Sequence, residues 1–118
     1  GRSLAPVTTM PPVSGEPVRV AVRDNMLEAR YEALADGELA GIARYELRDG
    51  AVVLTHTVVL PEFEGRGVGG QLARGALDDL RDHGRRVIPE CPYMAAWIRR
   101  HPEYAELVPE DERYRVER

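Results

Sequence analysis

Apolar and polar residues alternate along the middle of the chain in a pattern typical of β-strands. Asp36-Gly37 and Asp49-Gly50 interrupt this alternation, and Asp-Gly is a strong two-residue hairpin turn. Short turns join neighbouring antiparallel strands, so the segment should form an antiparallel meander. With a first turn at Arg23-Asp24-Asn25, the pattern predicts three strands at about 26–34, 39–48 and 51–60.

The third predicted strand, 51–60, is largely apolar on both of its faces. Strict alternation places one set of side chains on one face: Val52, Leu54, His56, Val58 and Leu60. A strand that is apolar on both sides is typical of the centre of a sheet. We therefore expect this strand to be covered on both faces, with His56 among apolar neighbours.

A helical pattern over 68–83 follows this strand, and Gly84 is a natural residue for the helix end. The apolar stripe of this helix consists of Val68, Leu72, Ala76 and Leu80. Residues 86–91 then predict a short strand. A strand, a helix and a second strand form a βαβ unit, so 51–60 and 86–91 should run parallel. Ligands bind outside the carboxyl ends of such strands.

The rest of the chain divides into a folded part and two ends. Pro92 predicts the start of a short helix that ends before Pro102, and 104–108 is a possible final strand. We expect a flexible arm over 1–17, which is rich in proline, a folded domain over 18–108, and a frayed, charged tail over 109–118.

Composition narrows the class of protein. A chain of 118 residues, 43% hydrophobic and 31% charged, is typical of one soluble domain. No apolar run approaches the roughly 20 residues that span a membrane. A net charge of −4 argues against nucleic acid as a partner and favours cationic ligands. We expect a monomer or weak homodimer.

Cys91 is the only cysteine, so the chain forms no intrachain disulfide, and a reducing, cytoplasmic setting fits. The three histidines, His56, His83 and His101, show no metal-ligand spacing with it. Metal binding therefore has no support in the sequence.

Glycines are concentrated between the third strand and the helix, at Gly65, Gly67, Gly69 and Gly70. Glycine permits positive φ and removes side chains, so successive backbone N–H groups can converge on an anion. The helix start adds its unpaired N–H groups and the positive end of its dipole. The stretch predicts a phosphate-binding loop.

Three known kinds of glycine-rich connection resemble this loop. A Walker A loop is excluded because Gln71-Leu72 stands where Lys-Ser or Lys-Thr is required. Gly65-x-Gly67-x-x-Gly70 satisfies the dinucleotide fingerprint, with Glu90 about 20 residues further on as the ribose-binding acid. The short chain and the antiparallel meander leave room for only one βαβ unit, which disfavours this hypothesis. A purely structural tight turn is the third alternative.

The string over 61–69, Pro-Glu-Phe-Glu-Gly-Arg-Gly-Val-Gly, resembles motif A of the GNAT superfamily of acyl-CoA N-acyltransferases. In that motif Gln/Arg-x-x-Gly-x-Gly/Ala follows a Pro-Glu-aromatic lead-in. Glu64 departs from it by occupying the Gln/Arg position, and Arg66 is available to offset its charge. The resemblance extends over about 20–108, and a minimal, single-domain branch is similar at His56-Thr57, Cys91-Pro92-Tyr93 and His101-Pro102-Glu103-Tyr104.

The resemblance implies an α+β, GNAT-like acyl-CoA N-acyltransferase fold in which the two parallel strands splay apart and admit acetyl-CoA. The backbone of Val58, Val59 and Leu60 would pair with the pantetheine arm, and an N–H near Val59 would polarise the thioester carbonyl. The amides of Arg66, Gly67, Val68, Gly69 and Gly70 would hold the pyrophosphate, and Glu64 and Gly65 join them among the implied cofactor-binding residues. The implied reaction is transfer of the acetyl group to a small-molecule or protein amine by direct attack in a ternary complex.

Four side chains are candidates for the chemistry. His56 and Glu90 are possible general bases. Many family members place a proton-donating Tyr near the position of Arg99, so Tyr93 is the substitute donor here. Cys91 would lie at the thioester, where a thiolate is able to accept the acetyl group. A hypothesis of a different class is a coenzyme A-binding sensor or interaction module with little catalysis.

Overall fold

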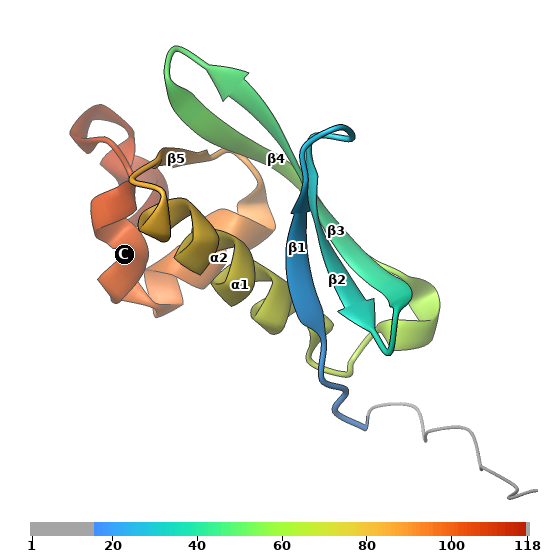
Figure 1. The fold of residues 1–118 in the computed structure, drawn as a ribbon. Coiled ribbons are helices and arrows are strands. Elements are labelled where there is room, and N and C mark those ends of the chain that lie inside the picture. Colours follow the sequence, from blue (N-terminus) through green and yellow to red (C-terminus); the bar gives the residue numbers. More distant parts are fainter. Residues whose placement is uncertain (1–15, 118) are drawn as a thin grey trace, which may run out of the picture.

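A five-stranded mixed sheet in the order β1-β2-β3-β4-β5 forms the centre of the computed structural model, which describes residues 16–117 (Figure 1). The strands are β1 (Ala21–Asn25), β2 (Arg30–Ala35), β3 (Glu38–Arg48), β4 (Ala51–Val59) and β5 (Arg86–Pro89). The helices are α1 (Val68–Asp82) and α2 (Pro92–Arg100), with 3-10 helices η1 (Pro61–Phe63), η2 (Pro102–Leu107) and η3 (Glu110–Val116). The fold is α+β, as predicted.

Strands β1 to β4 form the antiparallel meander, and both predicted Asp-Gly turns are confirmed. Asp36-Gly37 and Asp49-Gly50 have positive φ at both residues, which a type I′ hairpin turn requires. The first predicted turn is wrong, because Arg23-Asp24-Asn25 pairs with β2 and the chain turns at 26–29 instead.

β4 and β5 run parallel, as the βαβ pattern predicted. Their register begins at Ala51 with Arg86 and ends at Leu54 with Pro89, after which the Cys91 N–H donates to the Leu54 carbonyl over 2.9 Å. β4 continues beyond this pairing to Val59, whereas β5 ends at Pro89. Within residues 16–117, the segment 55–59 therefore has no partner strand on the β5 side, and we call this the open edge of β4.

α1 packs its predicted stripe against the sheet, where Val68, Leu72, Ala76 and Leu80 are all buried. α2 joins the same core through Met94, Trp97 and Ile98. Fully burying a side chain of this size stabilises the fold by about 1.5–3 kcal/mol. In the described part of the chain neither α-helix covers the opposite side of the sheet, which we call the open face.

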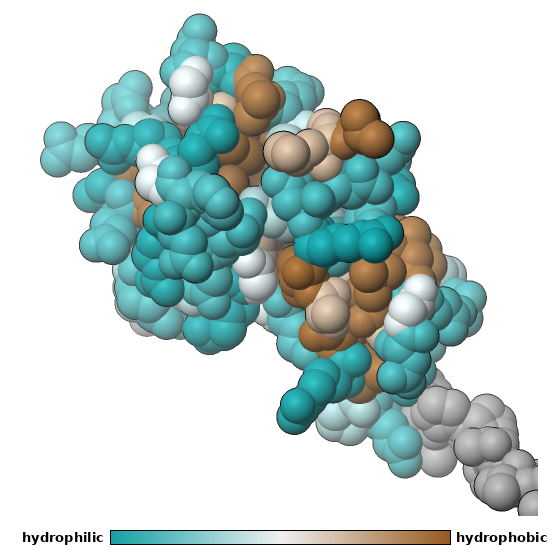
Figure 2. All heavy atoms as spheres, viewed as in Figure 1, coloured by the Kyte–Doolittle hydropathy of each residue, from teal (hydrophilic) through white to brown (hydrophobic). Residues whose placement is uncertain are grey.

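The open face combines a buried carboxylate with apolar side chains. Glu32, only 2% exposed, accepts hydrogen bonds from Arg23 (2.9 Å), Arg30 (2.8 Å) and Asn25 (3.0 Å). The bonds from Asn25 and then Arg30 lower the pKa of Glu32 to about 2 despite the opposing effect of burial. Figure 2 shows hydrophobic side chains gathered over the meander between hydrophilic ones.

The C-terminal part differs from the prediction. Residues 104–107 belong to η2 and Val108 caps it, so no strand forms there, and most of the segment expected to fray forms η3. Val116 in η3 is 6% exposed, and Arg99 on α2 donates to the Arg115 carbonyl over 2.8 Å. Most of the tail therefore packs against the domain.

The expected arm over 1–17 lies outside the described residues, apart from Glu16 and Pro17. In the part of the chain that the structure does describe, no helix has the length and apolar character to cross a membrane.

Candidate functional site

The glycine loop is built as a strand-to-helix connection that leaves backbone donors free. Gly65 and Gly67 have φ of 74° and 81°, a region that favours glycine, and Gly67 caps α1 without a side chain. Within residues 16–117, the first-turn N–H groups of Val68, Gly69 and Gly70 have no backbone acceptor. These donors lie at the positive end of the α1 dipole, an arrangement that binds phosphate.

The outer side of this loop is fixed by the segment that leads into β1. Arg66 donates from Nε to the Glu16 carbonyl over 2.9 Å, and Gln71 donates to the Val18 carbonyl over 2.6 Å. The Arg66 guanidinium also donates to the Glu62 carbonyl over 3.4 Å. Arg66 is thus held by backbone oxygens, and Glu64 beside it is exposed.

A β-bulge in β4 redirects the side chains of the predicted site. Arg44 on β3 pairs with His56, whereas the next residue, Tyr45, pairs with Leu54, so Thr55 is an extra residue on β4. An extra residue exchanges the two faces of all the residues that follow it. The expectation that His56 shares the face of Leu54 is therefore wrong.

Beyond the bulge, Thr57 and Val59 face α1, while His56 and Val58 face the open side. Val59 packs against the core, and Val58 is 46% exposed. His56 is exposed as well, and not surrounded by apolar neighbours. The role of His56 as a general base stays a prediction, and its side chain lies on the open face.

Thr57 is the β4 side chain next to Cys91. The Thr57 hydroxyl and the Cys91 thiol are 3.3 Å apart, within hydrogen-bond contact. Cys91 is 4% exposed and occupies the N-cap position of α2. Sequence analysis missed Thr57, although it is the second residue of the quoted His-Thr pair.

Tyr93 reaches across to the start of α1. A Cβ added at Gly69 would lie 2.6 Å from the Tyr93 hydroxyl oxygen, so the phenol covers the glycine of the first helical turn. Burial is the main effect that raises the pKa of Tyr93, with a smaller contribution from Cys91 and an opposing one from Arg100. A higher pKa makes this phenol a weaker acid than a solvent-exposed tyrosine.

The Glu90 side chain lies on the opposite side of the sheet from the side chains of Cys91 and Tyr93. Its carboxylate accepts a hydrogen bond from Arg48 over 2.9 Å and lines a pocket with Ile88 and Ala51, on the open side of β5. The bond from Arg48 lowers the pKa of Glu90. A lower pKa keeps the carboxylate ionised and makes it a weaker base.

The candidate residues thus form two groups on opposite sides of the open edge of β4. The glycine loop, Thr57, Cys91 and Tyr93 lie on the helix side, and His56 and Glu90 lie on the open face. The Leu60 N–H donates to β3, so by alternation the Val59 N–H points into the open edge. Within the described residues, no group of His, Cys, Asp or Glu is arranged to hold a metal ion.

The topology does not support the dinucleotide hypothesis. Only β4 and β5 run parallel among the five strands, whereas a dinucleotide fold needs several adjacent parallel strands. Glu90, the acid which that hypothesis assigns to the ribose, is paired with Arg48.

A meander, a parallel strand pair that separates at its carboxyl end, and a glycine loop at a helix start define an acetyltransferase-like domain of the GNAT type. The family model described as GCN5-related N-acetyl-transferase matches residues 30–107, more than half of the 118-residue chain, and the chain belongs to this family. No curated protein matches the chain. Family membership supports an acyltransferase-type function in general.

Proposed function

We propose that the domain binds acetyl-CoA and transfers its acetyl group to a primary amine. The observation that carries this proposal is the free first turn of α1 next to the open edge of β4. The first turn of α1 supplies N–H donors for a diphosphate, and the open edge of β4 supplies backbone donors and acceptors for an extended amide chain.

The residues present fit this cofactor. The N–H groups of Val68, Gly69 and Gly70 would hold the pyrophosphate, and the backbone of Thr57 and Val59 would pair with the pantetheine arm. The positive φ of Gly65 and Gly67 lets the backbone approach the phosphates closely. When bound, acetyl-CoA supplies an activated acetyl carbonyl, and the Val59 N–H points to the edge where a donor would polarise it.

The side chains on the two faces then take different roles. Tyr93 and Cys91 lie on the helix side, where Tyr93 would donate a proton to the leaving sulfur. His56 lies on the open face, where it would accept the proton of the attacking amine. Glu90, ionised and paired with Arg48, would attract the amine more effectively than it would deprotonate it. Direct transfer from cofactor to amine uses Tyr93, His56 and Glu90 and needs no chemistry from the Cys91 thiol.

Thiol release by the purified protein, measured with acetyl-CoA and a panel of amines, tests the proposal. We expect Tyr93→Phe to lower kcat by about 10²-fold, within the range for loss of a general acid, while affinity for coenzyme A changes little. Cys91→Ala separates direct transfer, which tolerates it, from transfer through the thiol, which does not. Absence of release with every amine would contradict the proposal.

A coenzyme A-binding module without catalysis is the second candidate. It is favoured by Arg99, which stands near the usual position of the proton-donating tyrosine and whose guanidinium is bonded to the Arg115 carbonyl. This module would bind coenzyme A and acetyl-CoA equally well and would leave the thioester intact with every amine.

A further inference from the structure

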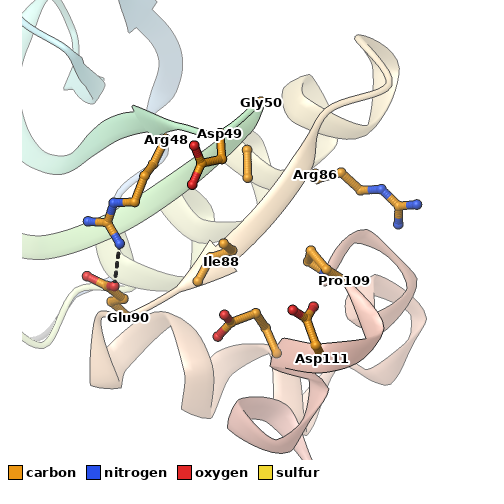
Figure 3. Close-up of a pocket in the computed structure, with 10 residues that line it drawn as sticks. Arg48, Asp49, Gly50, Arg86, Ile88, Glu90, Pro109 and Asp111 are labelled. Atoms are coloured by element: carbon orange, nitrogen blue, oxygen red, sulfur yellow. Dashed lines mark hydrogen bonds and ion pairs between the residues drawn. The ribbon is translucent and has the colours of Figure 1, made fainter.

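A groove on the open face runs along the β4–β5 pair. It has a cavity volume of about 320 Å³ and lies between the β3–β4 turn, β5 and the C-terminal η3 (Figure 3). Ala51 and Ile88 supply apolar lining, and the turn residue Asp49 and Asp111 of η3 bring carboxylates to it.

The charges that line the groove leave an excess of carboxylates. Asp49, Glu90, Asp111 and Glu112 line the groove with the guanidinium groups of Arg48 and Arg86. Glu112 forms an ion pair with Arg115 at 2.7 Å, so the excess negative charge lies at Asp49 and Asp111. Arg48 is already bonded to Glu46 and Glu90, both at 2.9 Å. Figure 3 shows the Arg86 guanidinium directed away from Arg48 and Glu90. The groove therefore favours a cation.

The groove leads to the open edge of β4. Every second residue of β5 and its continuation, Arg86, Ile88 and Glu90, lines the groove. This row begins at the end of the groove far from Cys91 and ends at the residue before Cys91. Cys91 is bonded to Leu54, where the parallel pairing stops. Four residues of extended strand cover about 13 Å, so the groove suits a linear molecule whose end reaches that edge.

One wall of the groove lies beyond the segment shared with the family. Pro109, Asp111 and Glu112 follow residue 107, where the family match ends. The wall is held by Arg99, which donates to the Arg115 carbonyl, and by the burial of Val116. The groove is thus completed by residues that lie outside the family match.

We propose that this groove binds the acceptor and selects linear amines that carry a second positive charge, an inference that rests on the proposed transferase function. One ammonium group lies among Asp49 and Asp111, and the other end reaches the open edge. There the N–C bond to the acetyl group forms as the S–C bond of the thioester breaks. The acceptor group starts as an ammonium ion and loses two protons. One goes to the sulfur, so the products are the amide, the free thiol and one proton.

Acetylation of two ligands matched in length, 1-aminodecane and 1,10-diaminodecane, tests this selection, because a ten-carbon chain is long enough to cover the four-residue span to the open edge. We expect a kcat/KM for the diamine at least about fivefold higher, and the preference should shrink in high salt because the groove is open to solvent. A lysine-containing basic peptide distinguishes a protein acceptor from a free polyamine. Equal kcat/KM for the monoamine and for both dications would overturn the inference while leaving the transferase function standing.

Two hairpin turns of identical sequence provide a matched control. Asp49→Asn and Asp111→Asn together should lower kcat/KM for the diamine about three- to tenfold and leave the monoamine unchanged. Asp36→Asn removes the same charge from the other Asp-Gly turn, which has the same positive φ but does not border the groove, and should change neither substrate. An equal effect of Asp36→Asn would contradict the assignment.

An NMR titration with 1,10-diaminodecane alone keeps the inference testable if no amine is acetylated. Shifts of the Asp49, Ile88 and Asp111 amides, reduced in the double variant, would support a cation groove even though the transferase proposal had failed. No shift at these amides at millimolar diamine would overturn it.

Discussion

At the residue scale, the contact between Tyr93 and Gly69 joins the start of α2 to the start of α1. The hydroxyl sits where a Cβ at position 69 would have to be. Any larger residue there must displace the phenol, since a heavy-atom approach of 2.6 Å is well inside van der Waals contact.

Gly69→Ala should therefore lower stability by about 1–3 kcal/mol through overpacking, although alanine is the better helix former. Urea unfolding of a double-mutant cycle with Tyr93→Ala checks the cause. In the Tyr93→Ala background the clash is gone, and Gly69→Ala should be neutral or stabilising. An equal penalty in both backgrounds would show that Tyr93 does not occupy this position.

Glu32 predicts an acid-sensitive fold. Its folded pKa of about 2 lies below the ordinary value of 4.5, so the ionised carboxylate contributes stability that is fully present above pH 4.5 and lost as the pH falls towards 2. Glu32→Gln should cost about 1–3 kcal/mol at pH 7 by leaving Arg23 and Arg30 without their acceptor. Unfolding curves of the two proteins should converge between pH 4.5 and 2, whereas a constant gap would contradict the account.

His56 and Thr57 show why the site was only partly predictable. Strict alternation gave the correct face up to Leu54, but the bulge at Thr55 reverses it. Bulges are favoured by tertiary packing, and Thr-His-Thr contains no glycine to mark one. The loop glycines, Cys91 and Tyr93 were predictable because a strand, a helix and a second strand bring those chain segments to one edge.

At the element scale, η3 is the part of the chain most unlike its prediction. Its charged sequence lacks an apolar period, yet Val116 and the Arg99 bond hold it in place. Similarly, the polar residues Asp24 and Asn25 suggested a turn but lie in β1, where they bond to Tyr45 and Glu32. Helices α1 and α2 and the Asp-Gly turns were predicted correctly because local sequence determines them.

Deletion of residues 109–118 should separate the two halves of the proposed site. Loss of Val116 burial and the Arg99 bond should cost about 2–4 kcal/mol, and preference for the diamine should disappear. Affinity for coenzyme A should stay within about twofold, because its expected contacts lie in 57–70. Calorimetric titration checks this, and a large loss of coenzyme A affinity in a folded protein would refute it.

Val116→Ala is the milder control, since it leaves the groove residues in the chain. It should cost about 1–2.5 kcal/mol, scaled from the burial of an aliphatic side chain, and weaken the diamine preference only partly. A stability equal to that of the wild type would mean that η3 does not pack as described.

At the scale of the whole molecule, the sheet separates two sides that carry different candidate residues. The helix side gathers the glycine loop, Cys91 and Tyr93, and the open side gathers His56, Glu90 and the acidic groove. Transfer at the open edge of β4 would join a donor bound on one side to an amine bound on the other. The oligomeric state stays a prediction.

An NMR titration of the labelled protein with coenzyme A tests the central claim most directly. The claim predicts saturable shifts at the amides of Val68, Gly69, Gly70 and Val59, with smaller changes at Asp49 and Asp111 in the groove. Saturation accompanied by shifts elsewhere, with these four amides unchanged, would contradict it, as would no shift at millimolar coenzyme A.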